Sequence, residues 1–418
     1  MKNESIIGQS FTLPNGSVVK NRLLKSAMSE ALGTAEGCPK NALVTLYQTW
    51  AQGGIGLCVT GNVMIDRRAL GEPGNVVIED ERHLDYLRQW AAAATQNHTQ
   101  CWVQLNHPGK QSPKGLNKEN VSPSAVPFRK EMQAFFATPR ALSHDEIVDI
   151  INRFGRAAAI VKKAGFTGVQ IHGAHGYLVS QFLSPHHNIR TDEWGGSADN
   201  RRRFVIEVYK SIREAVGKEF PVSIKLNSAD FQRGGFTEEE SLDTIKVLSD
   251  IGMDLIEISG GTYEAPVMTG AKALRPATAK ASTLAREAYF LEFAEKARQI
   301  ISSPLAVTGG FRTLKGMADA ISIGAVDFVG IARQLAIEPD APNRLLAGKE
   351  VLYQVEAKKT GVSYIDKMGL MEVSWYTQQL KRIGNGKPAD PNASVWLTLV
   401  KALSSQMQVG KIFTRVRA

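Results

Sequence analysis

Short apolar runs alternate with longer amphipathic stretches along most of the chain. The runs are continuously apolar, which is typical of strands that are buried on both faces of a sheet. They therefore predict strands rather than exposed loops. The predicted strands cover residues 22–27, 55–60, 101–105, 168–172, 222–226, 255–259, 305–308 and 327–331.

The stretches between these runs carry the signals of helix boundaries. Ser143, Thr237 and Thr313 stand where a side-chain oxygen can cap the first turn of a helix. Gly165 and Gly252 stand where a left-handed helix end favours glycine. The predicted helices cover residues 81–97, 144–163, 198–216, 238–251, 285–300 and 314–323.

Eight such βα units predict an α/β fold, a (β/α)8 TIM barrel over residues 1–350. A doubly wound sheet would normally place a GxGxxG string after its first strand, and the chain has none. The turn at residues 14–16, Pro-Asn-Gly, predicts an N-terminal hairpin. Residues 109–142 are too long for a plain loop, so we expect a capping insertion over the barrel mouth. Residues 351–418 are expected to form a C-terminal extension.

Charge and composition narrow the function classes. The net charge is +9, and residues 359–418 hold nine Lys or Arg against three Asp or Glu. The barrel itself is therefore near neutrality, which disfavours nucleic-acid binding. No apolar run approaches the roughly 20 residues of a membrane span, no signal peptide is evident, and the cysteines form no CxxC pair. We expect a cytoplasmic protein that acts on a small molecule without a metal, and a homo-oligomer is compatible with this pattern.

Polar side chains gather where the predicted strands stop, which is where the active site of such a barrel lies. His172, His175 and Tyr177 follow the fourth strand. They could be a metal pair, a turn with polar caps, or two hydrogen-bond donors for a substrate oxygen beside a general acid.

Other strand ends indicate a bound anion and a buried amine. Gly309 and Gly310 let backbone N–H groups approach an anion, and Arg333 can hold a phosphate with two hydrogen bonds. Lys225 lies within the fifth strand, where a buried amine needs a partner. It could be a Schiff-base nucleophile or a cation that faces an electron-rich cofactor ring.

Several long motifs then resemble the old yellow enzyme family of flavin-dependent ene reductases, over roughly residues 5 to 350. The most specific are HGAHGYLVSQFLSP at residues 172–185 and NIRTDEWGGSADNRRRF at residues 188–204. Residues 51–57, residues 104–110 and the pair Ala332-Arg333 agree with the family pattern as well.

The resemblance implies non-covalent FMN, with NAD(P)H as the hydride donor. It implies that the chain reduces the C=C bond of α,β-unsaturated carbonyl compounds, or related activated alkenes and nitro compounds, by ping-pong hydride transfer through flavin N5. His172 and His175 would grip the carbonyl oxygen, and Tyr177 would deliver a proton to the α-carbon. With the phosphate turn included, the expected cofactor-binding residues are Ser26, Ala27, Met28 and Ser29, which would line the flavin through their backbone, and Asn62, Gln104, Lys225, Gly309, Gly310, Ala332 and Arg333.

The chain departs from the family pattern at the flavin. Ala27 replaces the usual Pro, and Ser29 stands where relatives carry Cys or Thr. Lys225 replaces the usual Arg, which exchanges a planar fork for a point charge. We therefore expect that the bound flavin is functional but that its reduction potential differs from that of the family's other members.

Three other functions are compatible with parts of the sequence. One is a class I aldolase that uses Lys225. Another is a flavin-dependent tRNA-modifying reductase, which would need a catalytic Cys and a basic groove. The last is a non-catalytic barrel that serves protein interaction and would purify colourless.

Overall fold

The computed structural model describes residues 3–261, 290–349, 358–362 and 370–401. Within these residues, eight parallel strands close into a barrel, because β13 pairs with β3 and β3 pairs with β4. This confirms the TIM-barrel prediction. The barrel strands are β3 (Leu23–Lys25), β4 (Leu57–Met64), β6 (Gln100–Asn106), β9 (Gly168–Gly173), β10 (Val222–Asn227), β11 (Leu255–Ser259), β12 (Leu305–Thr308) and β13 (Phe328–Ile331).

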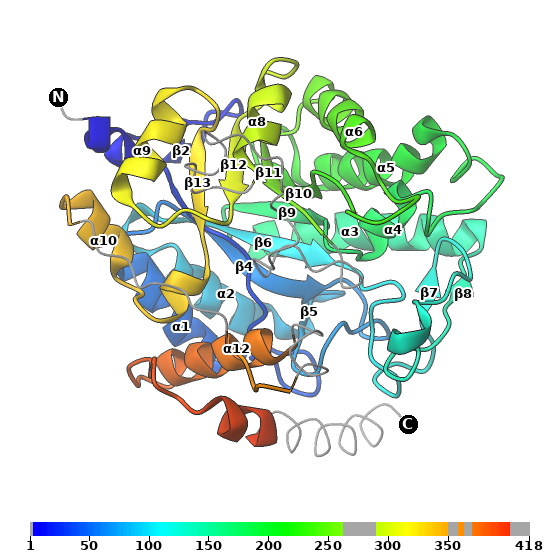
Figure 1. The fold of residues 1–418 in the computed structure, drawn as a ribbon, viewed down its shortest axis with the longest axis horizontal. Helices are drawn as coiled ribbons and strands as arrows, with labels where there is room; N and C mark the ends of the chain where they lie inside the picture. The colour runs from blue at the N-terminus through cyan, green and yellow to red at the C-terminus, as the bar shows by residue number, and fades with distance from the viewer. Residues whose placement is uncertain (1–2, 262–289, 350–357, 363–369, 402–418) are drawn as a thin grey trace.

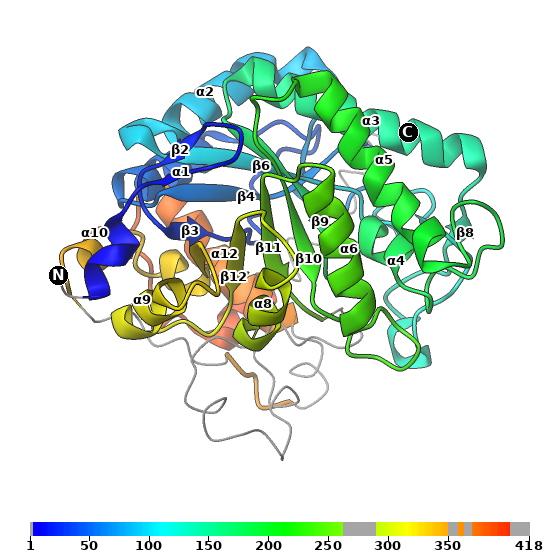
Figure 2. The ribbon, with the colours of Figure 1, turned by 90° about the horizontal axis from the view of Figure 1, so that it is seen from above.

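Helices surround the barrel as an outer ring (Figure 1, Figure 2). The predicted caps form: Ser143 and Thr237 make capping boxes, and Gly165 has a φ of 95°. Residues 285–289 of one predicted helix lie outside the described residues. The main helices are α1 (Asn41–Gln52), α2 (Leu84–Ala94), α3 (His144–Ala164), α4 (Leu178–Leu183), α5 (Ala198–Val216), α6 (Glu238–Asp250), α8 (Leu291–Arg298), α9 (Leu314–Ser322), α10 (Ala341–Leu346) and α12 (Leu370–Gly384).

The predicted hairpin is present at the N-terminal end of the barrel. Strands β1 (Phe11–Thr12) and β2 (Val18–Val19) pair antiparallel around a turn in which Gly16 has a φ of 87°. Leu13 and Val19 pack with inward-facing side chains of the barrel strands in one apolar cluster. The hairpin therefore closes this end of the barrel and leaves the other end for a site.

The insertion at residues 109–142 lies at the side of the molecule rather than across the barrel mouth (Figure 1). It contains β7 (Val121–Ser122) and β8 (Arg140–Ala141), which pair with each other. Its Ser122 hydroxyl donates a hydrogen bond to Gln181 of α4 at 3.1 Å. None of its residues lines the cavity described below.

Helix α12, which the sequence patterns did not predict, packs along α1 (Figure 1). Trp375 on this helix is fully buried, and its indole N–H donates to the carbonyl of Ala393 at 2.9 Å. Thr377 donates its hydroxyl proton to the carbonyl of Ser29 at 2.9 Å. The described part of the C-terminal extension is thereby attached to the segment that follows the first barrel strand.

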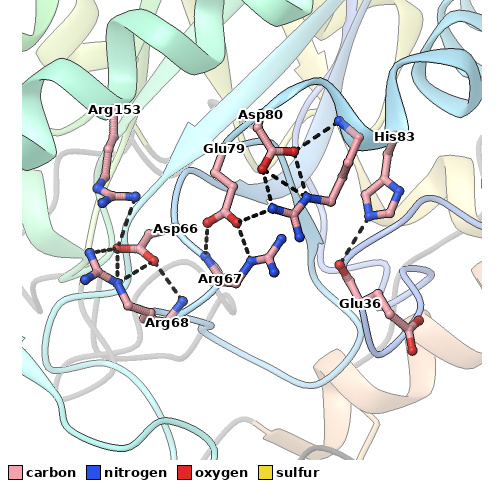
Figure 3. Close-up of polar contacts among 9 residues, drawn as sticks. Glu36, Asp66, Arg67, Arg68, Glu79, Asp80, His83 and Arg153 are labelled. Atoms are coloured by element: carbon pink, nitrogen blue, oxygen red, sulfur yellow. Dashed lines mark hydrogen bonds and ion pairs between the residues drawn. The ribbon is translucent and has the colours of Figure 1, made fainter. Parts of the chain in front are cut away.

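The loop after β4 is held by ion pairs (Figure 3). Asp66 pairs with Arg153 of α3 at 3.7 Å, and Arg67 pairs with Glu79. These contacts fix the loop from both ends, and it carries Glu72, which matters for the site. No helix among the described residues is long and apolar enough to cross a membrane.

Candidate active site

A cavity lies at the carboxyl ends of the barrel strands, and most of the expected site residues line it. Glu372, Val373 and Tyr376 of α12 complete its wall. Ser26, Gly309, Gly310 and Ala332 were expected at this site but are absent from the cavity lining. The expected residues that do line it are Ala27, Met28, Ser29, Asn62, Gln104, His172, His175, Tyr177, Lys225 and Arg333.

A sharp turn after β9 brings His172, His175 and Tyr177 together. A Cβ atom at Gly173 would lie 3.0 Å from the carbonyl oxygen of Lys225, so the strand packs closely here and a larger residue would require the neighbouring backbone to shift. His175 adopts a φ of 62°, and its backbone N–H donates to Asn227 Oδ1 at 3.1 Å. The ring of His172 then lies 5.2 Å from that of His175 and 4.7 Å from that of Tyr177, between centroids.

Both imidazoles are neutral at physiological pH. Burial, with the charge of Lys225, lowers the pKa of His175 to about 3 and holds the pKa of His172 well below its usual value. His172 Nδ1 accepts the backbone N–H of Ala174 at 3.3 Å, so its proton is on Nε2. His175 Nε2 lies 2.8 Å from Ser259 Oγ. The pair can therefore offer hydrogen bonds without bringing positive charge.

Tyr177 is buried beside an amide that can stabilise its anion. Asn62 Nδ2 donates to Tyr177 Oη at 3.3 Å. A hydrogen bond to the oxygen favours the phenolate that remains after the phenol gives up its proton. Asn62 Oδ1 is buried and has no hydrogen-bond partner within the described part of the chain, so it offers an acceptor to a ligand.

Lys225 has the partners that its buried position requires. Its Nζ donates to Ser26 Oγ at 2.8 Å and pairs with Glu257 at 3.0 Å. An ammonium group held by a carboxylate is a poor nucleophile, which disfavours the Schiff-base interpretation. Ser26 also donates its hydroxyl proton to Glu257. This explains why the Ser26 side chain does not line the cavity.

Ser29 lines the cavity, but its hydroxyl group is already engaged. It donates to Glu72, a carboxyl group whose pKa is raised by burial. Any effect of the Ser29 hydroxyl on a bound ring would therefore involve Glu72 as well, a contact that the sequence patterns did not indicate.

Arg333, the expected phosphate ligand, has an anionic partner from α12. Its Nη1 lies 2.5 Å from Glu372 Oε1. Burial raises the pKa of Glu372 against the opposing attraction of Arg333. Gly309 and Gly310 follow β12 with φ values of 110° and 95°, a conformation that suits glycine.

The residues present fit FMN. Lys225 and Arg333 supply cations for an electron-rich ring and a phosphate, and Asn62 Oδ1 supplies a buried acceptor without a partner. The described residues also place two neutral imidazoles and a phenol on the same cavity. This combination can bind an anionic cofactor and polarise the oxygen of a second ligand.

Besides Glu72, two further carboxylates beside the site were not anticipated from sequence. Glu257 interrupts the apolar run 255–259, and a charge inside a buried strand is a signal that could have revealed it. Glu372 lies in an ordinary amphipathic stretch and carries no comparable signal.

Comparison with known proteins shows which family the chain is similar to. Residues 10–351 match the NADH:flavin oxidoreductase / NADH oxidase family. The chain is 36% identical over 363 residues to an NADH-dependent flavin oxidoreductase, iliE, of Hypocrea jecorina, covering 82% of this chain and 89% of that protein. It is 35% identical over 394 residues to iliE of a Neonectria species, covering 89% of this chain but only 51% of the relative.

A solved structure supports the fold independently. The old yellow enzyme homologue of Zymomonas mobilis superposes with a TM-score of 0.69 at 22% identity, covering 86% of this chain and 99% of that one. At this identity the likeness concerns the fold alone.

Proposed function

Because the chain belongs to the NADH:flavin oxidoreductase / NADH oxidase family, which uses FMN with NAD(P)H as electron donor, we propose that it reduces activated C=C bonds. The substrates would be α,β-unsaturated carbonyl compounds or related activated alkenes and nitro compounds. The observation that carries the proposal is the arrangement of two neutral imidazoles and a buried phenol around one cavity.

Bound FMN would supply the hydride-transfer chemistry that links NAD(P)H to the acceptor substrate. The residues around it determine which acceptor is reduced. Arg333 would hold the phosphate, while Lys225, Gln104 and Asn62 would face the ring. These assignments follow from the cavity lining together with the charges and acceptors found there.

His172 and His175 would bind the carbonyl oxygen of the acceptor. His172 Nε2 carries the ring proton and donates it as a hydrogen bond, since Nδ1 is occupied by the backbone of Ala174. Neutral donors stabilise negative charge that develops on the oxygen without protonating it. The β-carbon of the acceptor becomes electrophilic as a result.

Tyr177 would supply the proton to the α-carbon. Its oxygen already accepts a hydrogen bond from Asn62, so the phenolate left behind is stabilised in place. The buried position of the phenol keeps bulk water from competing for this transfer.

A visible spectrum of the purified protein tests the proposal. We expect a flavin spectrum that bleaches when NADH or NADPH is added without oxygen and recovers when cyclohexenone is added. A flavin that bleaches but does not recover with enones or nitro compounds would contradict the substrate class. A protein that stays colourless in the presence of FMN would contradict the proposal as a whole.

A further inference from the structure

Glu257 lies behind the cavity, inside the barrel, and the proposed function leaves it without a role. It is on β11, its side chain is fully buried, and it does not line the cavity. A carboxylate in such a place requires compensation by charge and hydrogen bonds. The hydrogen bonds and the ion pair of Glu257 show which residues of the cavity it holds in place.

Both oxygens of Glu257 are used. Oε1 accepts hydrogen bonds from the hydroxyls of Ser26 and, at 2.7 Å, Thr308, and it pairs with Lys225 Nζ at 3.0 Å. Oε2 accepts Gln170 Nε2 at 2.9 Å. Burial alone would raise the pKa of Glu257, but Lys225 and the three hydrogen bonds outweigh it, so that the pKa lies below its usual value. The group is therefore an ionised carboxylate.

An ionised carboxylate only accepts hydrogen bonds, and this sets the direction of a chain of amides. Gln170 must turn its NH2 group to Glu257, so its carbonyl oxygen faces Gln104. Gln104 Nε2 then donates to Gln170 Oε1 at 2.8 Å. The carbonyl oxygen of Gln104 takes no part in this row of hydrogen-bonded amides, and Gln104 lines the cavity.

We propose that Glu257 is a positioning residue for cofactor recognition and a determinant of the flavin potential. It holds Lys225 directly and fixes the amide of Gln104 through Gln170. Its negative charge also weakens the stabilisation that Lys225 gives to the reduced cofactor. This inference rests on the proposed function, in which Lys225 and Gln104 face the flavin ring.

The expected effect of Glu257 on the flavin potential follows from its charge and its distance to Lys225. Reduction adds negative charge to a flavin ring, so a neighbouring cation favours the reduced form. A carboxylate 3.0 Å from Lys225 Nζ turns that isolated charge into a buried dipole, whose field at the cavity is weaker. Removal of the carboxylate charge should therefore make the bound flavin easier to reduce.

The test is the midpoint potential of the FMN-loaded Glu257→Gln variant, measured by equilibration with a reference dye. We expect the ratio of reduced to oxidised flavin at a fixed potential to rise about tenfold, equivalent to roughly +30 mV for a two-electron couple. A potential and an FMN affinity both equal to those of the wild type would overturn the inference. Loss of FMN from a folded variant would support the positioning role.

Thr308→Val is the matched control. It removes one hydrogen bond to Glu257 from the same buried cluster, keeps the size of the side chain and leaves the carboxylate in place. We expect its reduced-to-oxidised ratio to stay within about threefold of the wild type, because the pair of charges is retained. A shift as large as that of Glu257→Gln would show that the potential responds to packing rather than to the charge.

The double variant Lys225→Gln with Glu257→Gln covers the case in which Glu257→Gln does not fold, because it removes both buried charges together. We expect its ratio to fall less than about tenfold, since each lost charge offsets the other. A larger fall would mean that Lys225 acts on the flavin alone, and would overturn the inference. A wild-type protein without FMN contradicts the proposed function, whereas a loaded wild type whose Glu257→Gln variant keeps the same potential and FMN affinity contradicts only the role of Glu257.

Discussion

At the scale of single residues, Tyr177 and Asn62 form a hydrogen-bonded pair at the cavity. The amide donates to the phenol oxygen at 3.3 Å before any substrate binds. The two imidazoles beside the phenol are neutral, so they do not compete as acids at physiological pH. In the proposed function, proton delivery and oxygen binding would therefore fall to different side chains.

Tyr177→Phe is expected to separate the two half-reactions. Removal of the hydroxyl should slow reoxidation of the flavin by an enone by about 10²-fold to 10⁴-fold, since a positioned general acid contributes that much. Flavin reduction by NAD(P)H does not use this proton and should survive. Stopped-flow absorbance of each half-reaction measures both rates. The exposed Tyr86, changed to Phe, is the control, and an equal loss in both half-reactions would refute the role.

At the scale of elements, α12 connects the C-terminal extension to the cofactor cavity. It supplies three lining residues, and Thr377 attaches it to the backbone of Ser29. Its Glu372 engages the arginine that the phosphate would need. The helix therefore places its own carboxylate beside the arginine that we propose as the phosphate ligand.

Glu372→Gln is expected to tighten FMN binding by about threefold to tenfold, because Arg333 no longer has a competing carboxylate. The raised pKa of Glu372 also predicts that acidification protonates it and frees Arg333, so FMN affinity should rise toward lower pH in the wild type relative to the variant. Fluorescence titration of FMN into apoprotein at several pH values measures this. The exposed Glu292 on α8, changed to Gln, is the control, and weaker binding by Glu372→Gln would instead indicate that Glu372 orients Arg333.

Elements differed in how far the sequence could predict them. The barrel strands were visible because burial on both faces leaves continuous apolar runs, and capped helices such as α3 began where Ser143 indicated. Helix α12 has an ordinary amphipathic pattern, and nothing local indicates that it closes a cavity. The ion pair between Arg333 and Glu372 joins residues 39 positions apart, which no local pattern encodes.

At the scale of the whole molecule, buried neutral histidines make stability depend on pH. His107 is an example outside the cavity lining: burial lowers its pKa to about 4. The unfolded chain has the ordinary value near 6.5, so it takes up a proton first as the pH falls. The neutral form of His107 therefore contributes its full share to the free energy of unfolding only above about pH 6.5. This contribution decreases as the pH falls from 6.5 toward 4.

His107→Gln is expected to reduce this acid sensitivity. Between pH 7.5 and 5.5 the variant should lose about 1 kcal/mol less of its free energy of unfolding than the wild type does. Urea unfolding at the two pH values measures the difference. The same change at the exposed His98 serves as the control. An identical pH dependence in His107→Gln and the wild type would count against the buried neutral imidazole.

The sequence predicted some of the residues of the site. Strand ends indicated His172 and Tyr177, since polar residues that end apolar strands meet at one face of a barrel. Lys225 was indicated by its charge within a buried strand. The partners of these residues were not indicated. Ser26 faces Glu257 rather than the cavity, and the Ser29 hydroxyl is engaged by Glu72, because both depend on contacts between distant strands and loops.

The attachment of α12 to Ser29 has a consequence for the order of events during synthesis. Thr377 and Ser29 are 348 positions apart in the chain. During translation, the first wall of the cavity leaves the ribosome early, and the last wall follows only after every barrel strand. A barrel that folds during translation therefore has a mouth without one side until the chain has gone beyond Thr377, and only then can α12 close the cavity that we propose for the cofactor.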